Sequence, residues 1–467
     1  MAVIPVKKPR LGETQEVDAT TDKTLIQFVS ASGDTFGSEL EVDLTISRSA
    51  LEELLHGMQD VEACSYSFSL ITDDSVESEV KTTLHEAMQA HKLAGERAIQ
   101  VRFHPLSEFK VRSVTRCTAS MEGHTEAVLC AAFSPDSSTL ATGSGDSHVR
   151  LWDLTTSLPE ATCKGHTGWV LCIAWHPLGE LFASAGTDNT ARIWKASGAP
   201  AGILKGHLQP ITSLCWQPEH LGTPKIATAS KDGSVKVWCG RTCQIMKTLS
   251  GHTAPVMQVR WGGEDEIFSA GRDRVIKIWK DGQQQAELKG HAHWINSLAL
   301  SSEEVLRVGG DYQTWKSKHG NEKLLSASDD FTMILWGREL NGERKIINRM
   351  TGHQKVVNCV RFSPDGRFLA SASFDKSVRI WSAVSGKFVA ALRAHVAEVY
   401  VLAWSKDSRL VVSGSKDSTV KVWDLESRKL KEDLPGHADE VFAVDWSPDG
   451  RAVASAGRDK MVKIWQH

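Results

Sequence analysis

The chain repeats one residue pattern eight times at a spacing near forty residues. Each copy has a His, preceded by Gly seven times and by Ala once, then a turn Asp, and six residues after the Asp a Trp. In five copies the His and the Trp are 28 residues apart. The best-matched sets are His124, Asp146 and Trp152; His166, Asp188 and Trp194; His353, Asp375 and Trp381; and His437, Asp459 and Trp465. A period of this length indicates a repeat architecture.

Each copy contains the elements of one small sheet. In the first copy, a β-branched run at 149–152 follows the tight turn 144–147, and further strand-like runs lie at 128–136 and 161–164. Two strands joined by a tight turn make a hairpin. Four short strands make one propeller blade, so the chain is predicted to be mainly β, with an eight-bladed propeller over 113–467.

The repeated His, Asp and Trp are interpreted as structural residues. A buried Trp N–H needs a hydrogen-bond partner, and we expect a nearby Ser or Thr to join the three side chains in a chain of hydrogen bonds. The pattern resembles the WD-repeat family. A His–Asp–Ser set is similar to a hydrolase triad only in composition, and the sequence has no phosphate-binding loop, Cys-x-x-Cys pair or His-Glu-x-x-His motif. No catalytic residue and no cofactor of its own are predicted, so the protein is not expected to be an enzyme.

Two segments depart from the repeat. The last copy stops at 465–467 without an outer strand, and the β-like segment 113–118 is predicted to complete blade eight. In the fifth copy the His and the Trp are 45 residues apart, and the excess, 303–321, is predicted to be a loop that projects from the disc. It is either a tolerated surface insertion or a contact loop. In the second case Tyr312 and Trp315, among basic residues, would stack on bases or partner side chains.

Charge is distributed unevenly along the chain. Residues 1–113 hold 11 basic and 19 acidic residues, and the remainder holds 43 and 38, so a head of net charge −8 precedes a disc of +5. Two different partners are one interpretation, and an ordinary mixed surface is the other. The nine scattered Cys indicate free thiols in a reducing compartment. No long apolar run or signal peptide is present, so no membrane association is expected, and the basic cluster 7–10 could form part of a nuclear import signal.

A second, smaller domain precedes the propeller. Residues 1–22 are predicted to be disordered, and 23–112 to form a β-grasp domain similar to ubiquitin. Its predicted strands lie at 24–29, 40–44, 65–71 and 98–103, and its predicted helices begin at 49 and span 80–91.

This combination resembles the Notchless family. The segments that carry the resemblance are 109–117, 143–146, 370–377 and 434–450. The resemblance implies a large-subunit assembly factor of the nucleus, in both nucleolus and nucleoplasm, that works as a monomer within a large assembly. It implies that the propeller docks on the ribosomal proteins and rRNA of the pre-60S particle. It also implies that the ubiquitin-like domain binds the MIDAS domain of midasin, an AAA ATPase whose ATP hydrolysis remodels the particle.

The family resemblance also implies one metal-binding carboxylate. In that family an exposed acidic residue completes the coordination of the Mg²⁺ ion of the partner's MIDAS domain. The matching loop here is 71–79, and an ungapped match places Ser75 at the position, which lacks a carboxylate. Asp74 is therefore the first choice, with Glu77, Glu79 and Asp73 as alternates, because Mg²⁺ prefers hard oxygen ligands. The alternatives are an ordinary solvated loop and, for the whole chain, a substrate adaptor of a ubiquitin ligase or a signalling scaffold.

Overall fold

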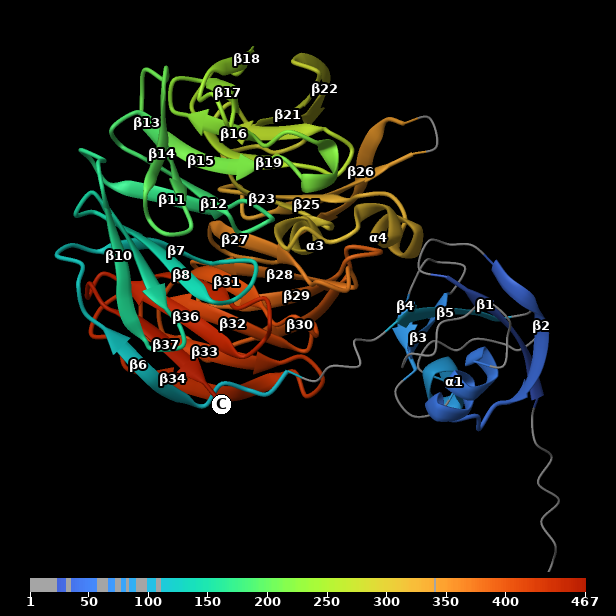
Figure 1. Cartoon of the computed structure of the whole chain (residues 1–467). Coiled ribbons are helices and arrows are strands. Elements are labelled where there is room, and N and C mark those ends of the chain that lie inside the picture. The colour runs from blue at the N-terminus through green and yellow to red at the C-terminus, as the bar shows by residue number, and fades with distance from the viewer. Residues whose placement is uncertain are drawn as a thin grey trace, which may run out of the picture. The chain divides into compact units, whose positions relative to one another are not determined.

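The computed structural model describes residues 23–30, 35–56, 66–71, 77–80, 84–89, 99–105, 111–339 and 342–467. The chain forms two compact units, of which the first ends at His104 and the second begins at Pro105 (Figure 1). The domain boundary predicted at 112/113 stays a prediction, and Val111 is already buried in a core of the second unit. Among the helices that the structure describes, none is long and apolar enough to span a bilayer.

The first unit is a five-stranded sheet with two helices. Its elements are β1 (Lys23–Val29), β2 (Thr35–Asp43), α1 (Arg48–His56), β3 (Tyr66–Ile71), β4 (Glu77–Glu79), α2 (Leu84–Gln89) and β5 (Ile99–Pro105). The strand order is β2-β1-β5-β3-β4, with β1 antiparallel to β2 and parallel to β5. Leu51 and Leu55 of α1 are buried in the same core as Phe28 and Phe68. The ubiquitin-like character of this unit stays a prediction.

Two details of the first unit differ from the sequence prediction. The short strand β4 was not foreseen, because three residues are too few for an alternating pattern to stand out. The second helix begins at Leu84 and not at Val80, because the Val80 N–H donates to the Phe68 carbonyl at 2.9 Å beside the β3–β4 pair.

The second unit contains eight four-stranded sheets, which confirms the eight-bladed propeller. Blades one to four are β7 (Val128–Phe133), β8 (Thr139–Ser144), β9 (His148–Asp153) and β10 (Leu158–Lys164); β11 (Val170–Trp175), β12 (Leu181–Gly186), β13 (Thr190–Lys195) and β14 (Pro200–Lys205); β15 (Ile211–Trp216), β16 (Lys225–Ser230), β17 (Ser234–Cys239) and β18 (Ile245–Ser250); and β19 (Val256–Trp261), β20 (Ile267–Gly271), β21 (Val275–Lys280) and β22 (Gln283–Lys289). Blades five to eight are β23 (Ile295–Leu300), β24 (Leu324–Ser328), β25 (Met333–Arg338) and β26 (Arg344–Met350); β27 (Val357–Phe362), β28 (Phe368–Ser373), β29 (Val378–Ser382) and β30 (Phe388–Leu392); β31 (Val399–Trp404), β32 (Leu410–Ser415), β33 (Thr419–Asp424) and β34 (Lys429–Pro435); and β35 (Val441–Trp446), β36 (Ala452–Gly457), β37 (Val462–Gln466) and β6 (Arg116–Met121).

The first strand of each blade lies at the centre of the ring. Each inner strand contacts the inner strands of the neighbouring blades, and β35 of blade eight contacts β7 of blade one, so the ring is closed. The hydrophobic core lies between adjacent blades. Val149 and Leu151 of blade one, for example, pack in one cluster with Val170 and Phe182 of blade two. The blades therefore stabilise one another in sequence around the ring.

Blade eight is completed by the strand that precedes blade one. β6 pairs antiparallel with β37, and Cys117 lies opposite Trp465. The prediction placed this strand at 113–118, but it begins three residues later. Val111 and Val114 are buried against the propeller instead, and the Val111 N–H donates to Asp407 Oδ2 at 2.7 Å. Closure from both ends of the chain leaves no open seam.

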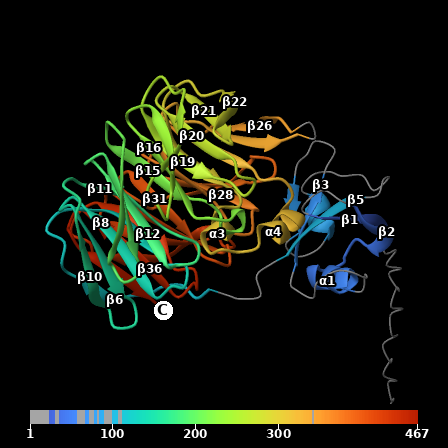
Figure 2. The same cartoon turned by 45° about the horizontal axis from the view of Figure 1, so that its top comes forward.

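The insertion in blade five is folded, so the prediction of a projecting loop was wrong. It forms α3 (Glu303–Arg307) and α4 (Tyr312–His319) (Figure 2). Trp315 stacks between Tyr312 and His319 of the same helix, at ring distances of 5.8 and 5.2 Å. Tyr312 also stacks on His220, which belongs to the short 3-10 helix η1 (Glu219–Leu221) of blade three, at 5.3 Å. Tyr312 and Trp315 are buried, so their rings are not available to stack on bases or on a partner.

Candidate functional site

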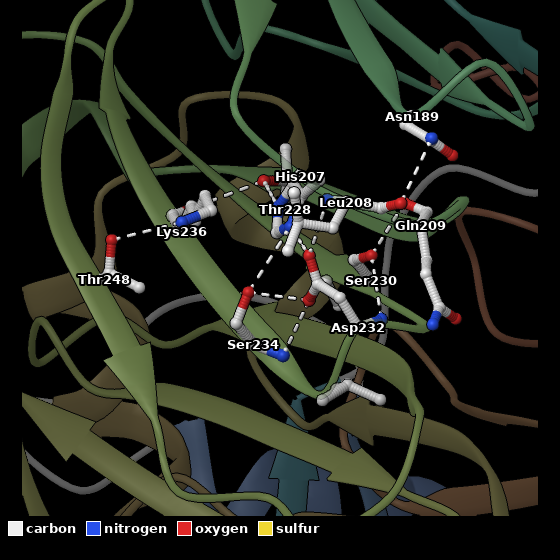
Figure 3. Close-up of polar contacts among 12 residues, drawn as sticks. Asn189, His207, Leu208, Gln209, Thr228, Ser230, Asp232, Ser234, Lys236 and Thr248 are labelled. Carbon is white, nitrogen blue, oxygen red and sulfur yellow. Dashed lines mark hydrogen bonds and ion pairs between the residues drawn. The ribbon is translucent and has the colours of Figure 1, made fainter.

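Each repeated His, Asp and Trp meets a hydroxyl in one chain of hydrogen bonds, which we call a tetrad. In blade three, His207 Nδ1 lies 2.8 Å from Asp232 Oδ2, and His207 Nε2 lies 2.8 Å from Thr228 Oγ1 (Figure 3). Trp238 Nε1 donates to the same hydroxyl oxygen at 2.8 Å. Asp232 also accepts the backbone N–H of Leu208 at 3.1 Å. The tetrad thus fastens the loop that enters the blade to the turn that carries the Asp.

All eight blades have this arrangement, with His Nδ1 to Asp distances between 2.6 and 3.0 Å. Sequence reasoning named the His, Asp and Trp residues but not the hydroxyl. The hydroxyl residue lies ten positions before the Trp in every blade, and this spacing is the signal that would have found it. The eight residues are Thr142, Ser184, Thr228, Ser269, Ser326, Ser371, Ser413 and Ser455.

The protonation states follow from burial and pairing. Burial acts to raise the pKa of Asp188, but the hydrogen bond from His166, its charge and two backbone N–H groups outweigh burial and lower the pKa to about 2. Burial lowers the pKa of His353 despite its hydrogen bond to Asp375. The pKa of Asp375 is lowered too, so in this tetrad a neutral imidazole donates Nδ1–H to an ionised carboxylate and accepts the hydroxyl proton at Nε2. The hydroxyl residues Ser184 and Ser371 are fully buried, so a substrate cannot reach them.

The tetrads define one face of the propeller. We call this the tetrad face, formed by the loops that carry each His and by the turns that carry each Asp. Neighbouring blades meet here. Asn189 in the turn of blade two donates to the carbonyl of Leu208 in the loop of blade three at 3.3 Å. The insertion lies at the other end of the inner strands, because it connects the end of β23 to the start of β24.

Helix α3 joins blades that are not neighbours. Glu303 Oε1 lies 3.2 Å from Arg260 Nε of blade four and 3.1 Å from Arg361 Nη1 of blade six. Burial acts to raise the pKa of Glu303, but the charges of the two arginines outweigh it, and the pKa is lowered. Arg307 pairs with Asp445 of blade eight. A cavity of about 280 Å³ is lined by residues of α3 and by the ends of the inner strands. The helix therefore braces this end of the central channel.

The acidic segment of the first unit is described only in part. Asp73 and Asp74 lie outside the described residues. Glu77 and Glu79 begin and end β4, where their backbones pair with Ile71 and Ser69 of β3. Within the described ranges, no group of three or more His, Cys, Asp or Glu side chains could hold a metal ion.

Eight blades with eight tetrads define a WD-repeat propeller protein. The sequence matches the family described as WD domain, G-beta repeat in eight segments, 115–153, 157–195, 198–239, 243–280, 282–337, 344–382, 386–424 and 428–466. The crystal structure of the computationally designed Ika8 protein has the same propeller fold. It is 26% identical in sequence, with a TM-score of 0.63, and the match covers 75% of this chain and all of that one.

The chain is also similar to curated proteins over most of its length. The chain is 42% identical to Protein Notchless of Drosophila melanogaster over 394 residues, which cover 77% of this chain and 78% of that protein. It is also 42% identical to Ribosome assembly protein 4 of Saccharomyces cerevisiae, over 77% of both chains. The chain belongs to the Notchless family.

Proposed function

We propose that this protein is an assembly factor of the large ribosomal subunit and not an enzyme. The observation that supports this is the 42% identity to a yeast protein named for ribosome assembly, over most of both chains. The tetrads agree with a binding role. Their hydroxyls are buried and their His and Asp side chains bond to one another, so the repeated polar residues hold the scaffold together.

In this proposal the propeller docks on the proteins and rRNA of the pre-60S particle. Closure by β6 and the brace by α3 give the docking surface a fixed shape, which lowers the entropy lost on binding. The protein acts as a monomer within the assembly, in the nucleolus and nucleoplasm.

The first unit has a different proposed partner, the MIDAS domain of a midasin-type AAA ATPase. A carboxylate of the segment 73–79 completes the coordination of the partner's Mg²⁺, with Asp74 first and Glu77, Glu79 and Asp73 as alternates. Carboxylate oxygens are the hard donors that Mg²⁺ takes in its octahedral shell, so the donor set fits. ATP hydrolysis by the partner then pulls on this unit and remodels the particle.

Affinity purification of the tagged protein tests this proposal. We expect large-subunit ribosomal proteins, precursor rRNA and a midasin-type ATPase in one eluate. A variant without residues 23–104 should retain the particle and lose the ATPase, because the second unit alone docks. Recovery of cullin or RING subunits in place of ribosomal proteins would instead support a ubiquitin-ligase adaptor.

A further inference from the structure

Four cationic side chains lie in turns of the tetrad face, in blades three, four and six. Lys231 precedes the tetrad Asp of blade three, Arg272 and Arg274 flank that of blade four, and Lys376 follows that of blade six. We call these four residues the basic sector. Lys231, Arg274 and Lys376 are exposed, and Arg272 is half-buried.

The basic sector lacks direct ion pairs with the acids of its own turns. The acidic residues of these turns have other partners, since each tetrad Asp bonds to its His and Asp329 accepts from Asn296 at 2.5 Å. Within the part of the chain that the structure describes, none of the four cations forms an ion pair. In blades seven and eight the cation that precedes the tetrad Asp is paired. Lys416 of blade seven lies 3.6 Å from Glu398, and Arg458 of blade eight lies 3.6 Å from Asp439 and 3.8 Å from Glu440.

Two exposed aromatic rings lie in blade five, between the cations of blades four and six. Trp294 is 38% exposed and Phe331 is 43% exposed. The Arg272 guanidinium lies 4.2 Å from the centre of the Trp294 ring, and its Nε has no hydrogen-bond partner among the described residues. Exposed rings beside cations that form no ion pair offer a ligand both stacking surfaces and positive charge.

Blade two provides an internal comparison. Trp169 occupies the position of Trp294, one residue before the inner strand, and it is 58% exposed. Where Trp294 has Arg272 beside it, Trp169 has Gly145 of the preceding turn, with Glu126 close by. Two blades thus have an aromatic residue at this position. A cation lies beside the ring at Trp294 and not at Trp169.

We propose that the basic sector, with Trp294 and Phe331, binds a single-stranded segment of RNA. The four cations contact phosphates, and the two rings stack on unpaired bases, which present a flat face whatever their sequence. A strand of this kind uses both the charges and the rings, whereas an acidic peptide uses only the charges. The proposal deepens the proposed function and rests on it for the source of the RNA, since precursor rRNA offers unpaired strands.

Fluorescence anisotropy with the purified full chain tests the proposal. The probe is a fluorescein-labelled oligouridine of about 12 nucleotides at about 100 mM salt, conditions under which phosphate contacts still contribute to affinity. The double variant Arg272→Ala/Arg274→Ala should bind about tenfold more weakly, and its affinity should depend less steeply on salt. Trp294→Ala should weaken binding about fivefold or more, and Trp294→Phe should restore most of it, because one stacked base contributes on that scale.

Matched controls come from the same positions in other blades. Arg458→Ala and Trp169→Ala should each leave the affinity within about twofold, since Arg458 is paired and Trp169 has no cation beside it. All these residues lie on surface loops, and equal melting temperatures would show that each variant is folded.

Three results would overturn the proposal. They are no binding of the oligouridine by the parent protein, equal losses for Trp294→Ala and Trp169→Ala, or competition by an oligoglutamate of the same length as strong as that by unlabelled RNA. The last result would assign the basic sector to an acidic peptide. Because the assay contains no particle, its failure would leave the affinity purification, and with it the proposed function, unaffected.

Discussion

Arg307 and Asp445 form a two-pronged ion pair across the central channel. Arg307 Nη1 donates to Oδ1 at 2.9 Å and Nη2 to Oδ2 at 2.5 Å. The same carboxylate accepts the backbone N–H of Phe133 in blade one at 2.9 Å. Asp445 belongs to blade eight, so the insertion of blade five is bonded to the junction between blades eight and one, where the ring closes. Bidentate pairs of this kind are specific in geometry as well as strong.

Removing this ion pair should destabilise the propeller. We expect Arg307→Ala to lower the free energy of unfolding by about 1–3 kcal/mol, because Asp445 keeps its half-buried charge and loses its partner. A double-mutant cycle with Asp445→Asn, followed by urea unfolding, should give a coupling energy above about 0.5 kcal/mol. The exposed pair of Lys345 and Glu339, at 2.8 Å, is the control, and Lys345→Ala should cost less than about 0.5 kcal/mol. A coupling energy near zero would mean that α3 does not brace the ring.

Removing one tetrad hydroxyl should destabilise the propeller more than the loss of a single oxygen atom suggests. Ser371→Ala removes one oxygen but leaves Trp381 Nε1 and His353 Nε2 without partners, at a cost of about 1–3 kcal/mol for a buried polar group. Trp381→Ala also opens a cavity and should cost about 3–5 kcal/mol. Ser317→Ala, on the exposed side of α4, should change stability by less than about 0.5 kcal/mol. Equal melting temperatures for Ser371→Ala and Ser317→Ala would contradict the structural role of the tetrad.

Lowering the pH should reduce the stability of the propeller in two stages. The pKa of His353 in the folded protein lies below its ordinary value of 6.5, so below about pH 6.5 the unfolded chain binds protons that the folded tetrad does not, and stability falls. The pKa of Asp188 is lowered to about 2 from 3.8, so a second loss follows as the pH drops from about 4 toward 2. Melting temperatures measured by circular dichroism from pH 7.5 downward should decrease throughout, and a maximum near pH 5 would disagree with neutral tetrad histidines.

Truncations should locate the closing segment. A chain that begins at Val111 keeps β6 and the bond from Val111 to Asp407, and it should melt at the temperature of the parent protein. A chain that begins at residue 122 lacks β6, which exposes the edge of β37 and should cause aggregation. Light scattering and thermal unfolding distinguish the two. If both were equally soluble and stable, β6 would not be needed for closure.

The acidic segment should bind its partner only through a metal ion. Single Ala variants at Asp73, Asp74, Glu77 and Glu79 in the full chain are to be measured against a MIDAS domain with and without Mg²⁺. We expect Asp74→Ala to weaken binding about as much as chelation does, because a neutral side chain is a much poorer ligand for the ion. Parent-like binding by all four variants would show that no carboxylate of this segment is the metal ligand. Binding that does not depend on Mg²⁺ would contradict the choice of partner.

The repeated residues of the blades could be predicted from the sequence. The contacts between segments far apart along the chain could not. His353, Asp375 and Trp381 lie within one blade, and their spacing recurs, so the blade pattern was visible without coordinates. The fold of the insertion was not, although Tyr312, Trp315 and His319 have helical spacing. The partners that hold it come from far along the chain, since Tyr312 stacks on His220 and Arg307 pairs with Asp445. The unpaired state of Arg272 was hidden for the same reason, because it depends on which acids are already engaged.

The closing strand has a mechanical consequence. The chain enters the propeller through Val111 and β6, so tension applied along the chain from its N-terminal side acts first on this closing strand. The first bonds to carry it are those from Val111 to Asp407 and from Thr115 to the Gln466 carbonyl. Strand β6 would separate from β37 before force acts on the sheet of any other blade. Strand β6, which closes the ring, is therefore also the strand that tension is expected to detach first.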